Sequence, residues 1–284
     1  MFEIKTFSKV NSKLLLLIIF FSLALTLEGY DNQNDIVAIP KATVTFSDKT
    51  AQDVIKESNA TQWDLVIIGD SVMWGFATRY LEALEEDLGI EIKINNWSIG
   101  GDHSSKLLQR LRTNPELRHD LSEADIIIFE IPWNVVEAPL KTLCGWTSRD
   151  CGGDDNQDCL REAFNTYKSD TDGIIAEIVS IRSPSEALIR TMDTYIFNVG
   201  LLREHDLFKI IRKYWQDANS HVIEEAAKYN IPAARVYYAF MGGSGNEDPM
   251  EKDLVYDGFH TTEKGITLMV ELFRQIGYAY APEQ

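Results

Sequence analysis

Short apolar runs alternate along the chain with longer stretches in which apolar residues recur every three to four positions. The first run is LVIIG at 65–69, and it is followed at 80–89 by YLEALEEDLG, which has helical periodicity and closes on a glycine. A second run, IEIKINNW at 90–97, comes directly after that glycine. This order of strand, helix and strand is typical of a βαβ unit, in which the two strands pair in parallel.

The alternation continues to the C-terminus and predicts three further strands. We expect strands at 124–131, 187–198 and 233–240, and helices at 107–112, 160–181, 207–230 and 263–276. Strands joined by helical crossovers form parallel sheets with helices on both faces. The sequence therefore predicts an α/β fold, a three-layer sandwich at 63–279 with a central five-stranded parallel sheet. Residues 30–62 form a lead-in segment with a helix near 50–57.

The N-terminus has the layout of a secretory signal peptide. Lys5, Lys9 and Lys13 precede a mostly apolar run of 14 residues at 14–27. This run is shorter than the roughly 20 residues that span a bilayer, so we predict export with removal of residues 1–29. An uncleaved N-terminal anchor is the alternative, and contact with a membrane would then depend on this segment. In both cases the predicted location is secreted or extracytoplasmic.

Removal of residues 1–29 leaves a strongly acidic chain. Three lysines and two glutamates go with that segment, so 24 basic residues remain against 42 acidic ones and the net charge is −18. Such a charge repels nucleic acids and anionic membrane surfaces, so we expect no nucleic-acid partner. The 45% of apolar residues are enough to fill a sizeable core. The sequence indicates no oligomeric state.

Three cysteines, Cys144, Cys151 and Cys159, lie close together in the sequence. In an exported chain two of them are expected to form a disulfide, and we favour Cys151 with Cys159. A zinc site would need a fourth ligand at a known spacing, and none lies nearby.

Asp154, Asn156 and Asp158 have the alternate spacing that opens a calcium-binding loop. However, Cys159 stands where that loop requires a glycine, and Asn165 stands where it requires a bidentate glutamate. We therefore expect a solvated acidic loop and no bound metal.

Polar residues gather where the predicted strands end. Residues 69–71, GDS, follow the first strand, NNWSIGGDHS at 95–104 follows the second, and IPWN at 131–134 ends the third. A further polar segment, DGFHTTEKG at 257–265, lies just before the last helix. Because ligands of open parallel sheets bind beyond the carboxyl ends of the strands, these four segments predict one shared site.

The four segments resemble the sequence blocks of the SGNH, or GDSL-type, hydrolases, and the resemblance covers most of the chain after residue 63. Residues 69–71 are similar to the first block, which carries the nucleophilic serine. Gly101 and Asn134 are similar to the glycine and asparagine of the second and third blocks. Residues 257–260, DGFH, resemble the Asp-x-x-His of the fifth block.

The third block departs from the family pattern. Pro132 and Val135 stand where the family often has a glycine and an aspartate, which leaves the loop geometry around Asn134 open. The resemblance implies a flavodoxin-like SGNH hydrolase fold and ester hydrolysis by a serine nucleophile, without a metal or cofactor.

A serine hydroxyl needs a neighbouring base that takes its proton during attack. We predict Ser71 as the nucleophile and His260 as its base, because histidine titrates near neutral pH. Asp257, three residues earlier, is placed to fix the tautomer and orientation of the ring. His103 is a rival base, but no carboxylate follows it at a comparable spacing.

The tetrahedral intermediate also needs hydrogen-bond donors aimed at its oxygen. Gly101 suits this role because no Cβ obstructs its backbone N–H, and Asn134 offers a side-chain amide. The resemblance implies that the N–H of Ser71 is a third donor. Glu130 matches a glutamate of some SGNH proteins, and we assign it no role from the sequence.

These assignments predict an exported serine esterase that cleaves short acyl esters through an acyl-enzyme. Candidate substrates are O-acetyl groups on carbohydrate and short lipid esters. An α/β-hydrolase is the nearest enzymatic alternative, but Met73 interrupts its Gly-x-Ser-x-Gly elbow. A catalytically impaired extracellular binding protein with the same fold is the alternative from another functional class.

Trp74, Trp97 and Trp133 lie beside the predicted catalytic segments. They either pack the strand ends or form an aromatic-walled substrate pocket. A pocket with three indole walls would suit a sugar face or a compact apolar group and would leave little room for a long chain. On that interpretation, acetyl to butyryl esters are the best substrates.

Overall fold

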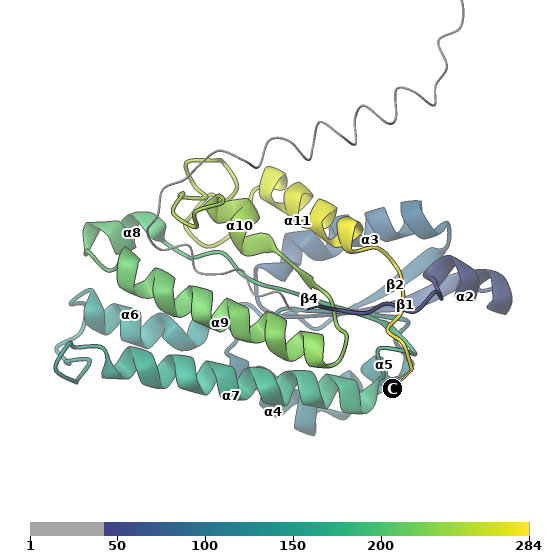
Figure 1. Ribbon diagram of the computed structural model, residues 1–284, viewed down its shortest axis with the longest axis horizontal. Helices are drawn as coiled ribbons and strands as arrows, with labels where there is room; N and C mark the ends of the chain where they lie inside the picture. The colour runs from purple at the N-terminus through teal and green to yellow at the C-terminus, as the bar shows by residue number, and fades with distance from the viewer. Residues whose placement is uncertain (1–42, 284) are drawn as a thin grey trace, which may run out of the picture. The chain divides into compact units, whose positions relative to one another are not determined.

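The computed structural model describes residues 43–283, and a parallel sheet of five strands lies at the centre of this part of the chain (Figure 1). The strands are β1 (Gln62–Ile68), β2 (Glu91–Asn96), β3 (Ile126–Phe129), β4 (Leu188–Met192) and β5 (Ala233–Ala234). Their order is β2-β1-β3-β4-β5, and every neighbouring pair is parallel. This is the flavodoxin-like order, and it confirms the predicted α/β fold.

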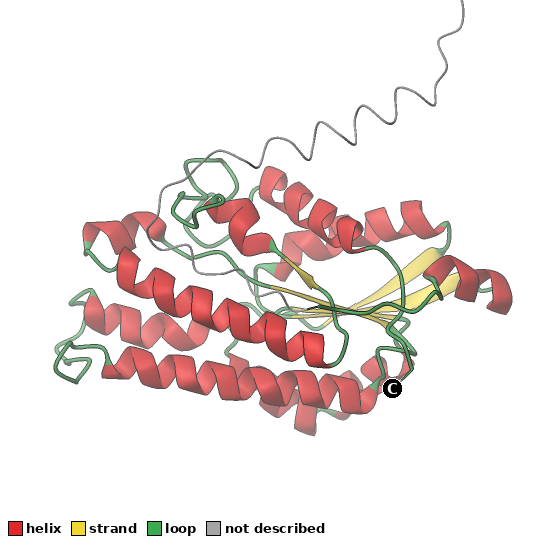
Figure 2. Cartoon of the chain, in the orientation of Figure 1, coloured by secondary structure: helices red, strands yellow, loops and turns green. Residues whose placement is uncertain are grey.

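Helices cover both faces of the sheet (Figure 2). They are α2 (Ala51–Ser58), α3 (Met73–Leu88), α4 (Ser104–Thr113), α5 (Pro115–Glu123), α6 (Glu137–Leu143), α7 (Asp158–Ile181), α8 (Val199–Glu204), α9 (Phe208–Lys228), α10 (Val236–Met241) and α11 (Glu263–Ile276), with a short 3-10 helix, η1, at Asn134–Val136. On one face α7 packs against α4, α5 and α9, and on the other α3 packs against α11.

The strands at the centre of the sheet are buried on both faces, which explains their near-continuous apolar runs. Every residue of β3 and of β4 is buried. Strand β4 includes Arg190, whose guanidinium donates hydrogen bonds to the carbonyl oxygens of Gly277 and Ala279. Burial lowers the pKa of Arg190 to about 10. Arg190 thus ties the middle of the sheet to the C-terminal segment.

Local sequence signals set several helix ends. Thr50 and Asp53 form a capping box at the start of α2. Gly89 ends α3 in the left-handed conformation, with φ of 70°. The hydroxyl of Thr262 accepts the N–H of Gly265 and caps α11, which begins at Glu263, the predicted first residue. Helix α11 therefore starts directly after the DGFH segment.

The strand predicted at 233–240 is wrong over most of its length, because α10 begins at Val236. A buried carboxylate beyond the end of β4 explains the difference. Asp193 accepts the N–H of Tyr237 at 2.7 Å and pairs with Arg235 at 3.1 Å. This cap comes from a distant part of the chain, which periodicity cannot show. The strand predicted at 187–198 is also too long, since β4 ends at Met192.

The described part of the lead-in segment packs against the C-terminal segment within one compact unit. Thr50 forms an antiparallel bridge with Ala279, and the fully buried Ala51 donates its N–H to the carbonyl of Tyr278 at 2.9 Å. The signal-peptide prediction for residues 1–29 lies outside the described residues. Within residues 43–283, each helix is too short or too polar to cross a membrane.

A disulfide joins Cys151 to Cys159, the pair favoured from the sequence, while Cys144 is free and buried. The disulfide closes the loop between α6 and α7. Asn156, one of the residues with calcium-loop spacing, uses its side-chain oxygen within this loop, where it accepts the N–H of Cys151 at 2.8 Å.

Candidate active site

Ser71 lies in a tight turn between β1 and α3. The carboxylate of Asp70 accepts the N–H of Val72 at 2.8 Å and holds this turn. The preceding Gly69 has no space for a side chain, because a Cβ there would lie 2.8 Å from a carboxylate oxygen of Glu130. The turn places Ser71 at the carboxyl edge of the sheet, where ligands bind in this class of fold.

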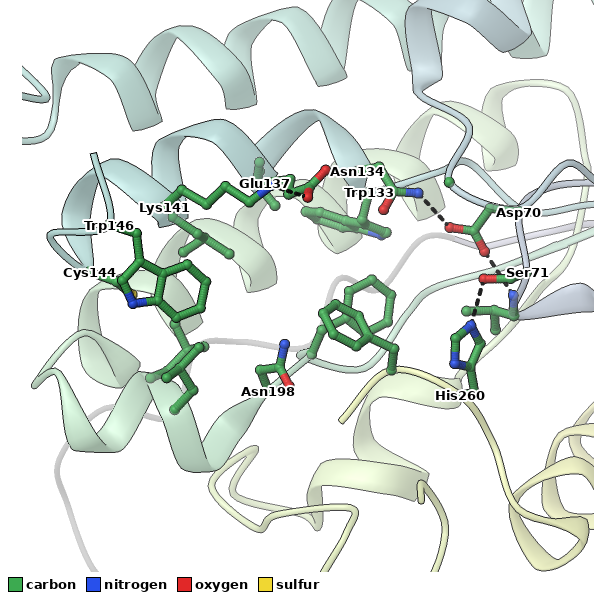
Figure 3. A pocket seen from close by; sticks show the side chains of 18 residues that line it. Asp70, Ser71, Trp133, Asn134, Glu137, Lys141, Cys144, Trp146, Asn198 and His260 are labelled. Carbon is green, nitrogen blue, oxygen red and sulfur yellow. Dashed lines mark hydrogen bonds and ion pairs between the residues drawn. The ribbon is translucent and has the colours of Figure 1, made fainter. Parts of the chain in front are cut away.

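His260 and Asp257 form a hydrogen-bonded chain with Ser71. Nε2 of His260 lies 3.0 Å from Oγ of Ser71 (Figure 3), and Nδ1 lies 2.6 Å from Oδ2 of Asp257. The other oxygen of Asp257 accepts the N–H groups of Phe259 and His260. Burial alone would raise the pKa of Asp257, but the hydrogen bonds from His260 and Phe259 outweigh it and lower that pKa. A carboxylate therefore faces Nδ1, which leaves Nε2 free to accept the serine proton.

The loop that carries Asp257 and His260 depends on Gly258. Its φ is +89°, and a Cβ at this position would lie 2.0 Å from Oδ1 of Asn198. The carbonyl of Gly258 accepts the N–H of Asn198 at 2.9 Å. The chain after β4 and the loop before α11 thus pack together closely, and this contact positions the histidine.

Ser71 and Gly101 offer two unpaired backbone donors. Neither N–H makes a hydrogen bond within residues 43–283, and both residues line the same cavity. Gly101 has a φ of +70°, a conformation that favours glycine. Unpaired N–H groups at a cavity wall are what a developing oxyanion needs.

Asn134 also lines the cavity, but its amide is already engaged. Nδ2 donates to Oδ2 of Asp70 at 3.0 Å and to the carbonyl oxygen of Asp102 at 2.7 Å (Figure 3 shows the first bond). An amide nitrogen carries two hydrogens. Asn134 must therefore release one of these bonds before it can donate to an oxyanion. The sequence does not indicate its hydrogen bond to Asp70.

Two carboxyl groups are buried behind the serine turn. Glu130 is fully buried, and its Oε2 accepts the N–H of Asp70 at 3.1 Å. Burial raises the pKa of Glu130 well above its usual range, and the nearby Asp70 carboxylate raises it further. Burial also raises the pKa of Asp70. A neutral Glu130 fits this setting, because two adjacent buried carboxylates repel each other.

A cavity of about 360 Å³ opens beside Ser71 and His260. Figure 3 shows these two residues at one end of the cavity and Cys144 and Trp146 at the other. Of the three tryptophans predicted to wall a pocket, only Trp133 lines this cavity. Trp146 was missed, because it lies far from every recognisable motif in the sequence.

The three predicted tryptophans have different surroundings. Trp133 is 1% exposed and stacks with Trp215 and Tyr167, with ring centroids at 4.2 and 4.3 Å. Trp97 donates its indole N–H to Asp120 at 2.8 Å, outside the cavity. The three indoles therefore do not all line this cavity: Trp97 lies outside it, whereas Trp133 both packs in the core and lines it.

Trp74, by contrast, is 53% exposed and lies on the surface next to Gly100. A Cβ built on Gly100 would lie 2.7 Å from its ring, so the indole covers the backbone just before Gly101.

The rival base and the possible metal ligands lie apart from the Ser71–His260 pair. His103 precedes α4, its backbone pairs with Trp133, and its ring makes no hydrogen bond within the described residues. One group of potential metal ligands occurs in residues 43–283, namely Asp172, His221 and Glu225. Two of these side chains, His221 and Asp172, already bond to each other at 2.6 Å.

No protein-family model matches the sequence, and no curated protein matches it. Solved structures do match. A lipase from a goat rumen metagenome has a TM-score of 0.61 and 21% identity, over 76% of this chain and 98% of that chain. A lipase/acylhydrolase from Enterococcus faecalis has a TM-score of 0.51 and 18% identity, over 78% and 100%. A variant of an acetyl xylan esterase from Geobacillus stearothermophilus has a TM-score of 0.51 and 17% identity, over 78% and 97%. This chain therefore has the α/β fold of these lipase and esterase structures.

Proposed function

We propose that this protein is a serine hydrolase of carboxylic esters. The observation that carries the proposal is the chain of hydrogen bonds from Ser71 through His260 to Asp257, with lengths of 3.0 and 2.6 Å. This chain borders a cavity that also contains two unpaired N–H groups. The lipases and the acetyl xylan esterase that share the fold support the same reaction class.

The reaction follows from this geometry in two stages. Oγ of Ser71 attacks the ester carbonyl while Nε2 of His260 takes its proton, and Asp257 stabilises the imidazolium that forms. The N–H groups of Ser71 and Gly101 receive the oxyanion, and Asn134 joins them when it exchanges one of its present bonds.

His260 then gives its proton to the alcohol oxygen, which departs and leaves the acyl group on Ser71. In the second stage a water molecule loses a proton to His260 and attacks the acyl carbon, and the proton returns to Ser71 as the acid leaves. No step of this route requires a metal or a cofactor.

The alternative of a binding protein without turnover is not favoured. Substitutions in the third block, at Pro132 and Val135, raised that alternative. Asn134 nevertheless lines the cavity with Ser71 and His260, and the latter two are within hydrogen-bonding distance.

We further propose that the enzyme acts outside the cytoplasm on small-molecule or carbohydrate esters. The disulfide between Cys151 and Cys159 supports an oxidising location. The sequence favours short acyl esters, either O-acetyl groups on carbohydrate or short lipid esters, and the names of the structural neighbours include both an acetyl xylan esterase and lipases.

Labelling with a fluorophosphonate tests this proposal. The reagent phosphonylates an activated serine, so we expect one adduct, mapped to Ser71 by peptide mass spectrometry and absent from the Ser71→Ala protein. A folded protein that takes up no reagent and hydrolyses none of a panel of simple esters would overturn the proposed reaction.

A further inference from the structure

The cavity beside Ser71 is apolar over most of its length. Near the catalytic residues it is bordered by Phe197 and Phe259, whose ring centroids lie 5.6 Å apart, and by Trp133. Farther along, the wall consists of aliphatic side chains, a thiol and an indole, contributed by Val136, Leu140, Cys144, Trp146, Leu201 and Leu202. Val136 lies in η1, Leu140 in α6, and Leu201 and Leu202 in α8, while Cys144 and Trp146 lie in the turn that follows α6.

The two charged side chains of the wall beyond Ser71, His260 and Asp257 are already paired with each other. Glu137 and Lys141 of α6 form an ion pair with each other at 2.5 Å (Figure 3). Beyond the catalytic residues only the side chain of Asn198 could replace the hydrogen bonds to water that a polar substrate chain would lose there, whereas a hydrocarbon chain loses none. The wall therefore favours hydrocarbon.

The acyl part of the ester fits this cavity better than the alcohol part. The alcohol must depart from His260, and a water molecule must then reach the same histidine, so the alcohol side has to be open to solvent. Large exposed rings lie outside the cavity near the triad. Trp74 is 53% exposed, and Tyr256 is 62% exposed and stacks with the ring of His260 at 5.9 Å. This leaves the apolar cavity for the acyl chain.

The volume of the cavity sets the length of that chain. A methylene group is similar in size to a water molecule, which occupies roughly 30 Å³ in the liquid. A cavity of about 360 Å³ therefore has room for on the order of ten carbon atoms. Trp74 and Trp97 do not narrow it, because neither lines it. The tryptophan argument for acetyl to butyryl groups thus loses two of its three walls.

On the basis of the proposed ester hydrolysis, we propose that the cavity lined by η1, α6 and α8 binds the acyl chain, and that the enzyme prefers medium-chain acyl esters of about six to ten carbons. Acetyl esters leave this space empty, so they gain little from it. The length of the acyl chain that fills this cavity therefore determines which ester is cleaved best.

A series of p-nitrophenyl esters from acetate to hexadecanoate tests this preference. Each buried methylene should raise kcat/KM by roughly threefold to fourfold, so octanoate, with six more methylenes, should exceed acetate by on the order of 10³-fold. A second series keeps the acetyl group and lengthens the alcohol from ethyl to octyl. Values of kcat/KM that rise only in the second series, or that are highest for acetate in the first, would overturn the proposal.

Variants of the far wall give an independent test, read as the ratio of kcat/KM for octanoate to that for acetate. Cys144→Phe fills the far end and should lower this ratio at least tenfold, whereas Cys144→Ala removes the thiol without adding bulk and should not. If Cys144→Phe does not fold, Trp146→Ala at a 59% exposed position should also lower the ratio, because it removes an apolar wall. Glu224→Phe places the same ring on the exposed face of α9 and serves as the matched control. A ratio that stays at the wild-type value in both wall variants contradicts the assignment.

A binding measurement separates this inference from the proposed reaction. Calorimetry with the Ser71→Ala protein should show tighter binding of decanoate than of butyrate, and Cys144→Phe in that background should abolish the difference. Absence of a chain-length effect in this experiment counts against the acyl cavity alone, while absence of a fluorophosphonate adduct on Ser71 counts against ester hydrolysis.

Discussion

The imidazole of His260 lies 3.0 Å from the hydroxyl oxygen of Ser71, although 189 residues separate the two in the sequence. Ser71 follows β1, and His260 immediately precedes the N-terminal end of α11. The cap of α11 by Thr262 and the close contact between Gly258 and Asn198 hold the histidine in place. The strand before Ser71 and the helix after His260 can be predicted from the sequence, whereas the contact between Gly258 and Asn198 cannot.

Ser71→Ala and His260→Ala should each lower kcat/KM by about 10⁴-fold or more, because nucleophile and base act as a unit. For the same reason the double variant should be no worse than either single variant. Circular dichroism and the melting temperature should stay close to wild type, since both side chains lie at the edge of a cavity. Substantial activity in either single variant, with no contaminating esterase, would contradict the assignment.

Asn134→Ala should lower kcat by about 10²-fold with little change in KM, because a bond to the oxyanion forms only in the transition state. The structure adds a second effect. The change removes the donor to Asp70 and to the carbonyl of Asp102, so stability should fall by about 1–3 kcal/mol. Steady-state kinetics and urea unfolding measure the two effects separately. A variant with raised KM and unchanged kcat would instead make Asn134 a substrate-binding residue.

The candidate catalytic segments could be proposed from the sequence because each lies at the end of a predicted strand or just before a predicted helix. Ser71, Gly101, Asn134 and His260 have local signals of that kind. The engagement of Asn134 by Asp70 could not be predicted, since it depends on the exact position of two side chains from different strands. Glu130 likewise shows its burial only once both faces of the sheet are covered.

The acyl cavity could not be predicted at all. Its far wall comes from α6, the turn after it and α8, and nothing in the sequence around Leu140, Trp146 and Leu201 indicates that these residues meet. Their proximity results from packing between loops that leave different strands. The length of β5 could not be predicted for the same reason. Asp193, from a distant loop, accepts the N–H of Tyr237 in α10, and the helix begins where the strand was expected to continue. Sequence patterns report strand ends and helix caps well, and side-chain contacts between loops poorly.

Glu130→Gln should change how stability depends on pH. Because burial raises the pKa of Glu130 above its ordinary 4.5, folding favours the neutral form. The stability that the neutral Glu130 side chain contributes is fully present below its unfolded-state pKa. It is lost as the pH rises through its folded-state pKa. The glutamine stays neutral, so its advantage in free energy of unfolding should grow in urea titrations as the pH rises above the ordinary pKa of a glutamate. The exposed Glu123→Gln is the control, and a Glu130→Gln advantage independent of pH would exclude a protonated Glu130.

The three cysteines should differ in reactivity toward Ellman's reagent. Cys144 is buried, and burial raises the pKa of its thiol, so it should react slowly in the native protein. One thiol per chain should react after denaturation without reduction, and three should react after reduction, because Cys151 and Cys159 are paired. Three reactive thiols in the denatured, unreduced protein would show that the disulfide is absent.

Trp133→Ala and Trp74→Ala should have different effects, although both residues flank the proposed catalytic segments. Trp133 is 1% exposed and stacked on two rings, so its loss should lower stability by about 3–5 kcal/mol. Trp74 is 53% exposed, so its loss should change stability by no more than about 0.5 kcal/mol.

Because the Trp74 ring covers Gly100 outside the acyl cavity, Trp74→Ala should raise KM for esters of bulky aromatic alcohols and leave the preferred acyl length unchanged. Urea unfolding and two substrate series, one varied in the alcohol and one in the acyl group, measure these effects. A shift in preferred acyl length in Trp74→Ala would place this indole on the acyl side of Ser71, and the division of the site into an acyl cavity and an alcohol side would then be wrong.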